Sequence, residues 1–188
     1  SFLVRSYLTR YAAGLAGAAI VGTGIWPGAL GTVGLSLARM LSTIRPRKQA
    51  MLLNALAFGP YNKPFEHRTL FDWLSRDRSN VDSYIADPLC GFVASNAFFF
   101  HLLSGIRAVN EPAAFAVPAQ LPLYIASGEL DPVGGARAVR AIAQQYQHAG
   151  SKQITSHIYP ADRHEIFNET DKAQVWSDFS AWLATLTS

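Results

Sequence analysis

The sequence predicts an α/β fold with a doubly wound parallel sheet, and two observations support this prediction. Apolar runs at residues 15–21, 123–127 and 154–159 have the length and composition of buried strands. Amphipathic patterns over residues 133–149 and 175–186 predict helices after the second and third of these strands. Strands that alternate with helices form parallel crossovers, and such crossovers place helices on both faces of one sheet.

Helices are also expected at the start of the chain and throughout its middle. Residues 2–12 have the apolar spacing of a helix. The segment 28–58 predicts two helices, with Pro46 in the first turn of the second one. A further apolar helix is expected over residues 92–106, whereas three prolines predict a connector over residues 110–122.

The composition suits one globular domain, or one domain with an inserted subdomain. The 188 residues are 49% hydrophobic and 15% charged, which provides enough apolar side chain for a packed core. The net charge of +3 comes from scattered basic residues without a nucleic-acid-binding motif, so nucleic acid is not an expected partner. Cys90 is the only cysteine, which excludes an intrachain disulfide and a cysteine–histidine metal site. A lone cysteine is compatible with a reducing compartment, and we expect a cytoplasmic location.

The segment from Tyr11 to Ala38 raises the question of a membrane. It contains no charged residue and follows Arg5 and Arg10, a pattern that is also typical of a signal peptide or transmembrane helix. Seven glycines and Pro27 interrupt it, however, as loops would. A non-catalytic, membrane-associated protein therefore stays open as an alternative.

Two residues at strand ends have the chemistry of a hydrolytic site. Asp131 and His164 each follow a predicted strand, and active sites of open α/β sheets lie beyond the carboxyl ends of the strands. A serine hydroxyl becomes a good nucleophile when an imidazole accepts its proton, and a carboxylate orients that imidazole. An alternative is that Asp131 is only a helix N-cap ahead of Pro132 and that His164 is an exposed loop residue.

The sequence resembles the monoacylglycerol lipase/lysophospholipase branch of the α/β-hydrolases, which is often grouped with serine aminopeptidase-like hydrolases. Residues 127–134 and 159–169 are similar to the acid and histidine motifs of that branch. Residues 1–5 resemble the helix that follows its Gly-His-Ser-Met-Gly nucleophile elbow, and residues 14–24 resemble the next strand. Three further segments resemble parts of its cap: Asn62-Lys63-Pro64-Phe65, residues 71–77 and residues 87–92.

This resemblance implies the C-terminal part of a doubly wound α/β-hydrolase sheet with an inserted helical cap. Residues 1–24 and 118–188 would belong to the core, and residues 25–117 would form the cap. The resemblance also implies that the nucleophilic serine and both oxyanion-hole amides precede Ser1, so this chain alone is expected to be inactive. A loose G-x-S-x-A at Ser36 is the alternative nucleophile, but it lies in the cap and follows no convincing strand.

The implied activity is hydrolysis of a carboxylic ester, with Asp131 and His164 as the acid and base of a serine triad. The expected substrate is a small acyl ester of the monoacylglycerol or lysophospholipid kind, with no metal or cofactor and at most transient contact with a membrane surface. A peptidase or another acyl hydrolase of the same fold is the alternative, and the oligomeric state is left open. Phe98 and Phe99 are candidates for lining an acyl-chain tunnel, although such phenylalanines also serve as core. Three residues are candidates for bracing, by hydrogen bonds, the loop that carries His164 (the histidine loop, after the strand at residues 154–159): Glu165, Asn168 and Glu169.

Overall fold

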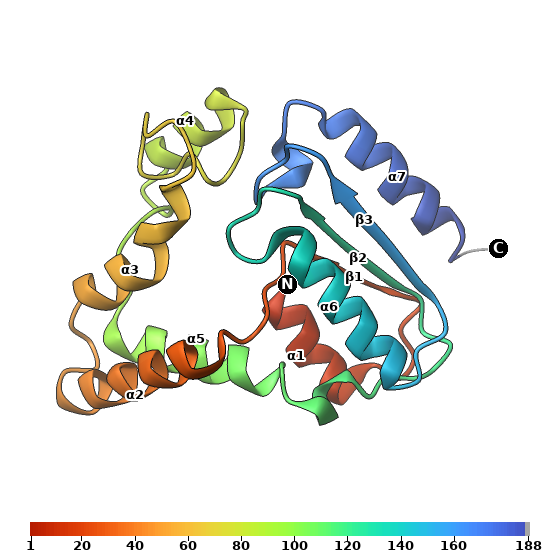
Figure 1. Ribbon diagram of the computed structural model, residues 1–188, viewed down its shortest axis with the longest axis horizontal. Helices are drawn as coiled ribbons and strands as arrows, with labels where there is room; N and C mark the ends of the chain where they lie inside the picture. Colours follow the sequence, from red (N-terminus) through yellow and green to blue (C-terminus); the bar gives the residue numbers. More distant parts are fainter. Residues whose placement is uncertain (187–188) are drawn as a thin grey trace.

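A computed structural model describes residues 1–186 of the chain. Its sheet has three parallel strands in the order β1 (Ala18–Val21), β2 (Leu123–Gly128) and β3 (Ile154–Tyr159). The α/β prediction is therefore confirmed, although the first strand is shorter than the apolar run at residues 15–21. Because the strands are parallel, their carboxyl ends lie at one edge of the sheet, which faces the helices drawn at the left of Figure 1.

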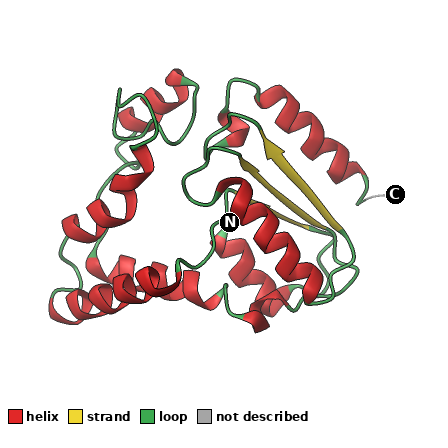
Figure 2. Cartoon of the chain, in the orientation of Figure 1, coloured by secondary structure: helices red, strands yellow, loops and turns green. Residues whose placement is uncertain are grey.

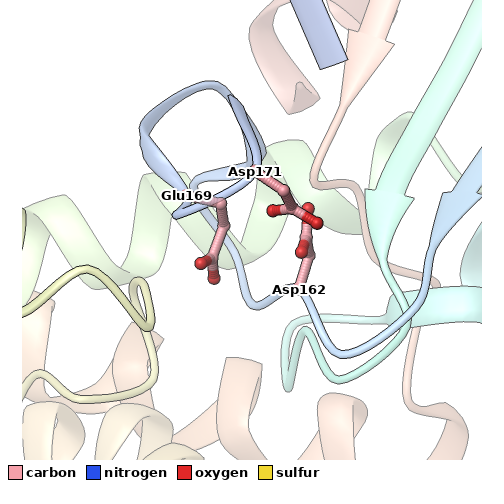
Figure 3. Close-up of side chains that lie close together, drawn as sticks. All are labelled: Asp162, Glu169 and Asp171. Carbon is pink, nitrogen blue, oxygen red and sulfur yellow. The ribbon is translucent and has the colours of Figure 1, made fainter. Parts of the chain in front are cut away.

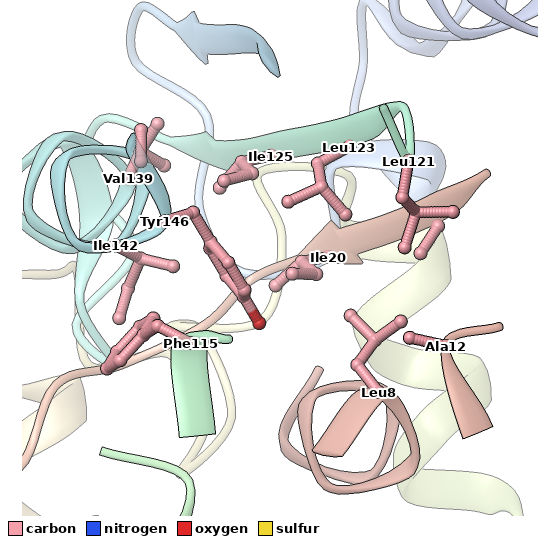
Figure 4. Packing of buried hydrophobic residues seen from close by; sticks show 12 residues of the cluster. Leu8, Ala12, Ile20, Phe115, Leu121, Leu123, Ile125, Val139, Ile142 and Tyr146 are labelled. Carbon is pink, nitrogen blue, oxygen red and sulfur yellow. The ribbon is translucent and has the colours of Figure 1, made fainter. Parts of the chain in front are cut away.

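Helices cover both faces of the sheet (Figure 1). Leu123 and Ile125 of β2 face the core that α1 (Phe2–Tyr11) and α6 (Gly135–His148) complete (Figure 4). Tyr124 and Ala126 point to the opposite face, against α7 (Lys172–Ala184). Every residue of β2 is buried, as its continuous apolar sequence predicts for a central parallel strand.

Between β1 and β2 the chain leaves the sheet and forms an all-helical arm (Figure 2). Its helices are α2 (Gly28–Ile44), α3 (Met51–Phe58), α4 (Arg78–Ala86) and α5 (Asn96–Ala108). Helices α2, α3 and α5 enclose a small core of their own, formed by Ala38, Ala50, Leu53 and Phe99. Short 3₁₀ turns complete the chain at Gly59–Asn62, Pro112–Phe115 and Ile166–Asn168.

The arm differs from the prediction at Pro46. The second helix begins at Met51 rather than at Pro46. The residues in between pair instead with the start of α5, where the amide of Ala97 donates to the carbonyl of Pro46 at 3.0 Å and that of Asn96 to the carbonyl of Lys48 at 2.9 Å. These long-range hydrogen bonds satisfy backbone groups that a helix would otherwise satisfy, and sequence spacing alone does not reveal them.

The two ends of the arm are joined to α1 by one buried arginine. Nη1 of Arg5 donates to the carbonyl of Gly24 at 2.9 Å, and Nη2 donates to the carbonyl of Val109 at 2.6 Å. Gly24 lies where the chain enters the arm, and Val109 caps α5 where it leaves. The Arg5 side chain therefore links the beginning and the end of the arm to helix α1 of the core.

The uncharged segment from Tyr11 to Ala38 is divided between the end of α1, the strand β1 and the first part of α2. Within residues 1–186, no helix combines the length and the apolar character needed to cross a bilayer.

Candidate active site

Asp131 and His164 meet beyond the carboxyl ends of β2 and β3. Nδ1 of the imidazole lies 3.0 Å from Oδ2 of Asp131 and 3.1 Å from Oδ1. The carboxylate is fully buried, whereas the His164 side chain is 28% exposed. Pairing at Nδ1 places the ring proton on that nitrogen and leaves Nε2 as the basic atom.

The carboxylate of Asp131 is itself held by two donors. The Ser127 hydroxyl donates to Oδ2 at 2.8 Å, and the backbone amide of Val133 donates to Oδ1 at 2.9 Å. The alternative prediction of a helix N-cap is wrong, because α6 begins only at Gly135 and the preceding Gly134 provides no side-chain cap. Asp131 instead closes its own turn and keeps its carboxylate directed at the imidazole.

Gly22, directly after β1, provides the backbone against which the imidazole packs. A Cβ on this residue would lie 2.9 Å from Cε1 of His164, closer than real side chains approach. Its φ of +58° is also in the left-handed region that favours glycine. The Gly22 amide donates to the carbonyl of Ala126 at 2.9 Å, so the sheet fixes its position. All three strands therefore contribute to the placement of His164.

The arm contributes two aromatic side chains, of which Trp73 contacts the His164 ring and Tyr61 contacts Trp73. The Trp73 ring lies 5.3 Å from the His164 ring, and the Tyr61 ring lies 5.2 Å from that of Trp73. Burial, assisted by the negative charge of Asp131, raises the pKa of Tyr61 above its ordinary value, so its hydroxyl stays neutral. Neither aromatic residue is predicted from the sequence, because both lie far from His164 along the chain and no local pattern connects them to it.

The loop that carries His164 is braced by two of the acidic residues proposed for this role. Oε2 of Glu165 accepts from Nδ2 of Asn80 at 2.7 Å and from Nδ2 of Asn168 at 3.1 Å. Oε1 of Glu169 accepts the backbone amide of Arg163 at 2.9 Å. Glu165, Asn168 and Glu169 therefore all take part in hydrogen bonds that hold the loop.

Phe98 and Phe99 have different environments on α5. Phe99 is only 1% exposed and belongs to the core of the arm, with its ring 6.0 Å from that of Phe58. Phe98 is 49% exposed. The alternative nucleophile Ser36 lies in the middle of α2, where its hydroxyl donates to the carbonyl of Thr32 at 3.0 Å. Ser36 therefore lacks the strand-to-helix turn that an activated serine occupies in this type of fold.

Three carboxylates of the histidine loop, which joins β3 to α7, are close enough together to bind a cation. Asp162, Glu169 and Asp171 each offer an oxygen within 4.8 Å of the others, and the carboxylates of Asp162 and Asp171 point toward one another (Figure 3). The guanidinium of Arg76, from the arm, forms an ion pair with each of them.

One known protein family matches most of the chain. The family model described as serine aminopeptidase, S33, matches residues 1–171. The chain belongs to the serine aminopeptidase S33 family. Asp131, His164 and the helices α2 to α5 of the arm all lie within the part that matches the S33 family model.

Individual proteins are similar to this chain in sequence or in fold. A monoacylglycerol lipase of Mycolicibacterium smegmatis is 29% identical over 117 residues, covering 61% of this chain and 39% of that protein. A thermostable carboxyl esterase from Bacillus coagulans, solved with glycerol, superposes with a TM-score of 0.88 at 23% identity, over 100% of this chain and 62% of that one. A monoacylglycerol lipase from Paleococcus ferrophilus gives a TM-score of 0.74 at 18% identity, over 98% of this chain and 65% of that one. The S33 chain thus has the α/β-hydrolase fold and spans less than two thirds of the length of these relatives.

Proposed function

We propose that the protein containing this chain hydrolyses carboxylic esters through a Ser-His-Asp triad in which His164 is the base and Asp131 the acid. The observation that carries this proposal is the 3.0 Å contact between Nδ1 of His164 and the buried carboxylate of Asp131. The membership of the serine aminopeptidase S33 family supports it. We further propose that the attacking serine and the oxyanion-hole amides are contributed by residues before Ser1.

In this mechanism the serine hydroxyl attacks the acyl carbonyl while Nε2 of His164 accepts its proton. The same nitrogen then gives the proton to the departing alkoxide, so an alcohol leaves and an acyl-enzyme forms. Water attacks the acyl-enzyme in a second round, in which His164 again accepts and returns a proton. Asp131 keeps the imidazole in the required tautomer and stabilises the imidazolium that forms in each round.

The proposed substrate is a monoacylglycerol or lysophospholipid. The similarity to a monoacylglycerol lipase supports this substrate class. We propose that the helical arm, within residues 25–117, acts as a cap over the site, since Trp73 brings it into contact with the His164 ring. Of the two proposed acyl-chain residues, Phe98 is half exposed on α5 and would contact the acyl chain, and Phe99 would support it from the core of the arm.

The test uses the encoded protein including the residues that precede Ser1. Reaction with a fluorophosphonate probe is expected in the wild type and lost in His164→Ala. A panel of a monoacylglycerol, a lysophospholipid and an aminoacyl-peptide amide of matched size then identifies the substrate class. Turnover of either lipid ester supports the proposal. Labelling together with cleavage of the peptide alone would replace it with a peptidase, and absence of labelling would contradict a serine hydrolase.

A further inference from the structure

One arginine of the arm is surrounded by acidic groups of the loop that carries His164. Nη2 of Arg76 donates to Oδ1 of Asp171 at 2.7 Å and is also bonded to Oδ1 of Asp162. Nε donates to Oε2 of Glu169 at 3.1 Å, and the backbone amide of Arg76 donates to Oε1 of the same residue at 3.0 Å. The arginine thus uses its side chain and its main chain on one loop.

Arg76 provides the positive charge beside these three carboxylates. The side chains of Asp162 and Glu169 are completely buried, whereas that of Asp171 is 50% exposed. Buried carboxylates destabilise a protein unless they are paired and hydrogen-bonded. Within residues 1–186, Arg76 is the only cationic side chain that forms an ion pair with any of the three. The neighbouring Arg163 is directed elsewhere and pairs with Glu66 of the arm at 2.8 Å.

The contact reaches His164 through the backbone. The amides of His164 and Glu165 donate to the carbonyls of Trp73 and Leu74, at 3.4 and 2.8 Å. Residues 73–76 therefore lie alongside the histidine loop, and Arg76, at the end of this segment, is hydrogen-bonded to the loop through its side chain and its backbone amide. Oε1 of Glu169 accepts both the Arg76 amide and the Arg163 amide, so one carboxylate oxygen joins the arm to the residue before His164.

We propose that Arg76 is a positioning residue for His164, holding the histidine loop in the conformation that presents the imidazole to Asp131. This inference rests on the proposed serine-hydrolase function. It adds that catalysis requires the guanidinium of Arg76, which the arm provides. Arginine suits the role better than lysine, because its planar fork can bind several carboxylates at once. Small displacements of a catalytic base are costly, since a shift of about 1 Å can lower a rate by about 10²-fold.

A divalent cation is the competing occupant of this acidic cluster. Oδ2 of Asp162 is buried and has no hydrogen-bond partner within the described residues, as a ligand atom awaiting a metal would be. The guanidinium, however, already bonds to the other oxygen of Asp162 and to both neighbouring carboxylates. A metal ion would have to bind directly beside this positive charge, which disfavours it.

The experiment compares Arg76→Ala, Arg76→Lys and the control Arg68→Ala in the complete protein, with a short-chain p-nitrophenyl ester as substrate. Arg68 belongs to the same arm, but its ion-pair partner is the exposed Asp82, at 2.7 Å, rather than a carboxylate of the histidine loop. For Arg76→Ala, kcat is expected to fall by on the order of 10-fold to 100-fold with KM within about twofold of the wild type. Arg76→Lys should be intermediate, and Arg68→Ala should stay within about twofold of the wild type.

Two further measurements separate positioning from a general loss of folded protein. Methylguanidinium added to Arg76→Ala should restore part of kcat, and the double variant Arg76→Ala/Glu169→Gln should be no slower than the slower single variant. Titration of active sites with the fluorophosphonate should still count nearly one site per molecule. If Arg76→Ala yields no folded protein, the test relies on Arg76→Lys. A kcat of Arg76→Lys equal to that of the wild type then overturns the proposal.

Other results also overturn the positioning role. One is an equal kcat for Arg76→Ala and Arg68→Ala, and another is a loss of rate in proportion to the loss of titratable active sites. A third is a wild-type rate that EDTA abolishes and Mg²⁺ or Ca²⁺ restores. Failure of the underlying function looks different. In that case the wild type itself does not react with the fluorophosphonate, whatever Arg76 does.

Discussion

The hydroxyl of Ser127 donates a 2.8 Å hydrogen bond to Oδ2 of Asp131, the same oxygen that lies 3.0 Å from Nδ1 of His164. Ser127 is fully buried near the end of β2, so water does not compete for this hydrogen bond. The sheet therefore controls the direction of the carboxylate through a side chain that does not touch the imidazole.

Ser127→Ala is expected to lower kcat by about 10-fold and leave KM unchanged, because Asp131 loses one of the two donors that orient it. The measurement is steady-state hydrolysis of a short ester by the complete protein. Ser151→Ala is the matched control, since this buried hydroxyl has no hydrogen-bond partner within the described residues and lies outside the site. Equal rates for the two variants would show that the Ser127 hydroxyl does not orient Asp131.

Gly22→Ala is expected to reduce turnover by on the order of 10-fold or more, because its new methyl group would displace the His164 ring. Gly14→Ala provides the control. Gly14 also has a positive φ, of +83°, but a Cβ there would meet no atom within 4 Å. Both variants should lose about 1 kcal/mol of stability from backbone strain. The prediction fails if both also lose the same activity.

The pH dependence of stability should report the buried Asp162. Burial is the main cause that raises its pKa to about 7, the neighbouring Asp171 and Glu169 add to the effect, and the positive charge of Arg76 opposes it. In the unfolded chain an aspartate has a pKa near 3.9, so between about pH 4 and pH 7 the folded state binds more protons. The free energy of unfolding contributed by this group therefore falls as the pH rises through that window, by at most about 1.4 kcal/mol per pH unit, and is constant above it.

Urea unfolding at pH 5.0 and pH 7.5 measures this effect. The wild type should lose stability at the higher pH relative to Asp162→Asn, because asparagine does not ionise. Asp82→Asn, at an exposed position on α4, is the control and should behave as the wild type does. The same pH difference in Asp162→Asn and in the wild type would contradict the assignment.

Arg5→Met is expected to cost about 3 kcal/mol or more of stability, because it leaves the carbonyls of Gly24 and Val109 without their buried donor. Arg10→Met, on the exposed face of the same helix, should change stability by less than about 0.5 kcal/mol. Chemical unfolding of the two variants makes the comparison. Similar stabilities would show that Arg5 does not secure the ends of the arm.

The sequence predicted those parts of the molecule whose pattern is local. The three strands and the helices α1, α6 and α7 follow from apolar runs and from amphipathic spacing, because each buries one continuous stretch of chain. Asp131 and His164 could be proposed as a pair, since parallel strands bring their carboxyl ends to the same edge. The start of α3 was misplaced, because residues 46–50 are fixed by hydrogen bonds to the start of α5 rather than by their own propensity.

The supporting residues of the site could not be predicted in this way. Trp73 and Arg76 come from the arm and lie about ninety residues from the histidine loop in sequence. No periodicity connects them to His164, and their contacts exist only after the arm has folded back onto the sheet. Gly22 carried a weak indication, because a glycine directly after a buried strand is typical of close backbone approach.

The central claim is that Asp131 acts through His164, and the rate of fluorophosphonate labelling of the complete protein tests it most directly. Asp131→Asn is expected to lower that rate by on the order of 10³-fold or more, as is His164→Ala, while the melting temperature of both variants stays close to that of the wild type. Near-normal labelling in the folded Asp131→Asn variant would contradict the triad.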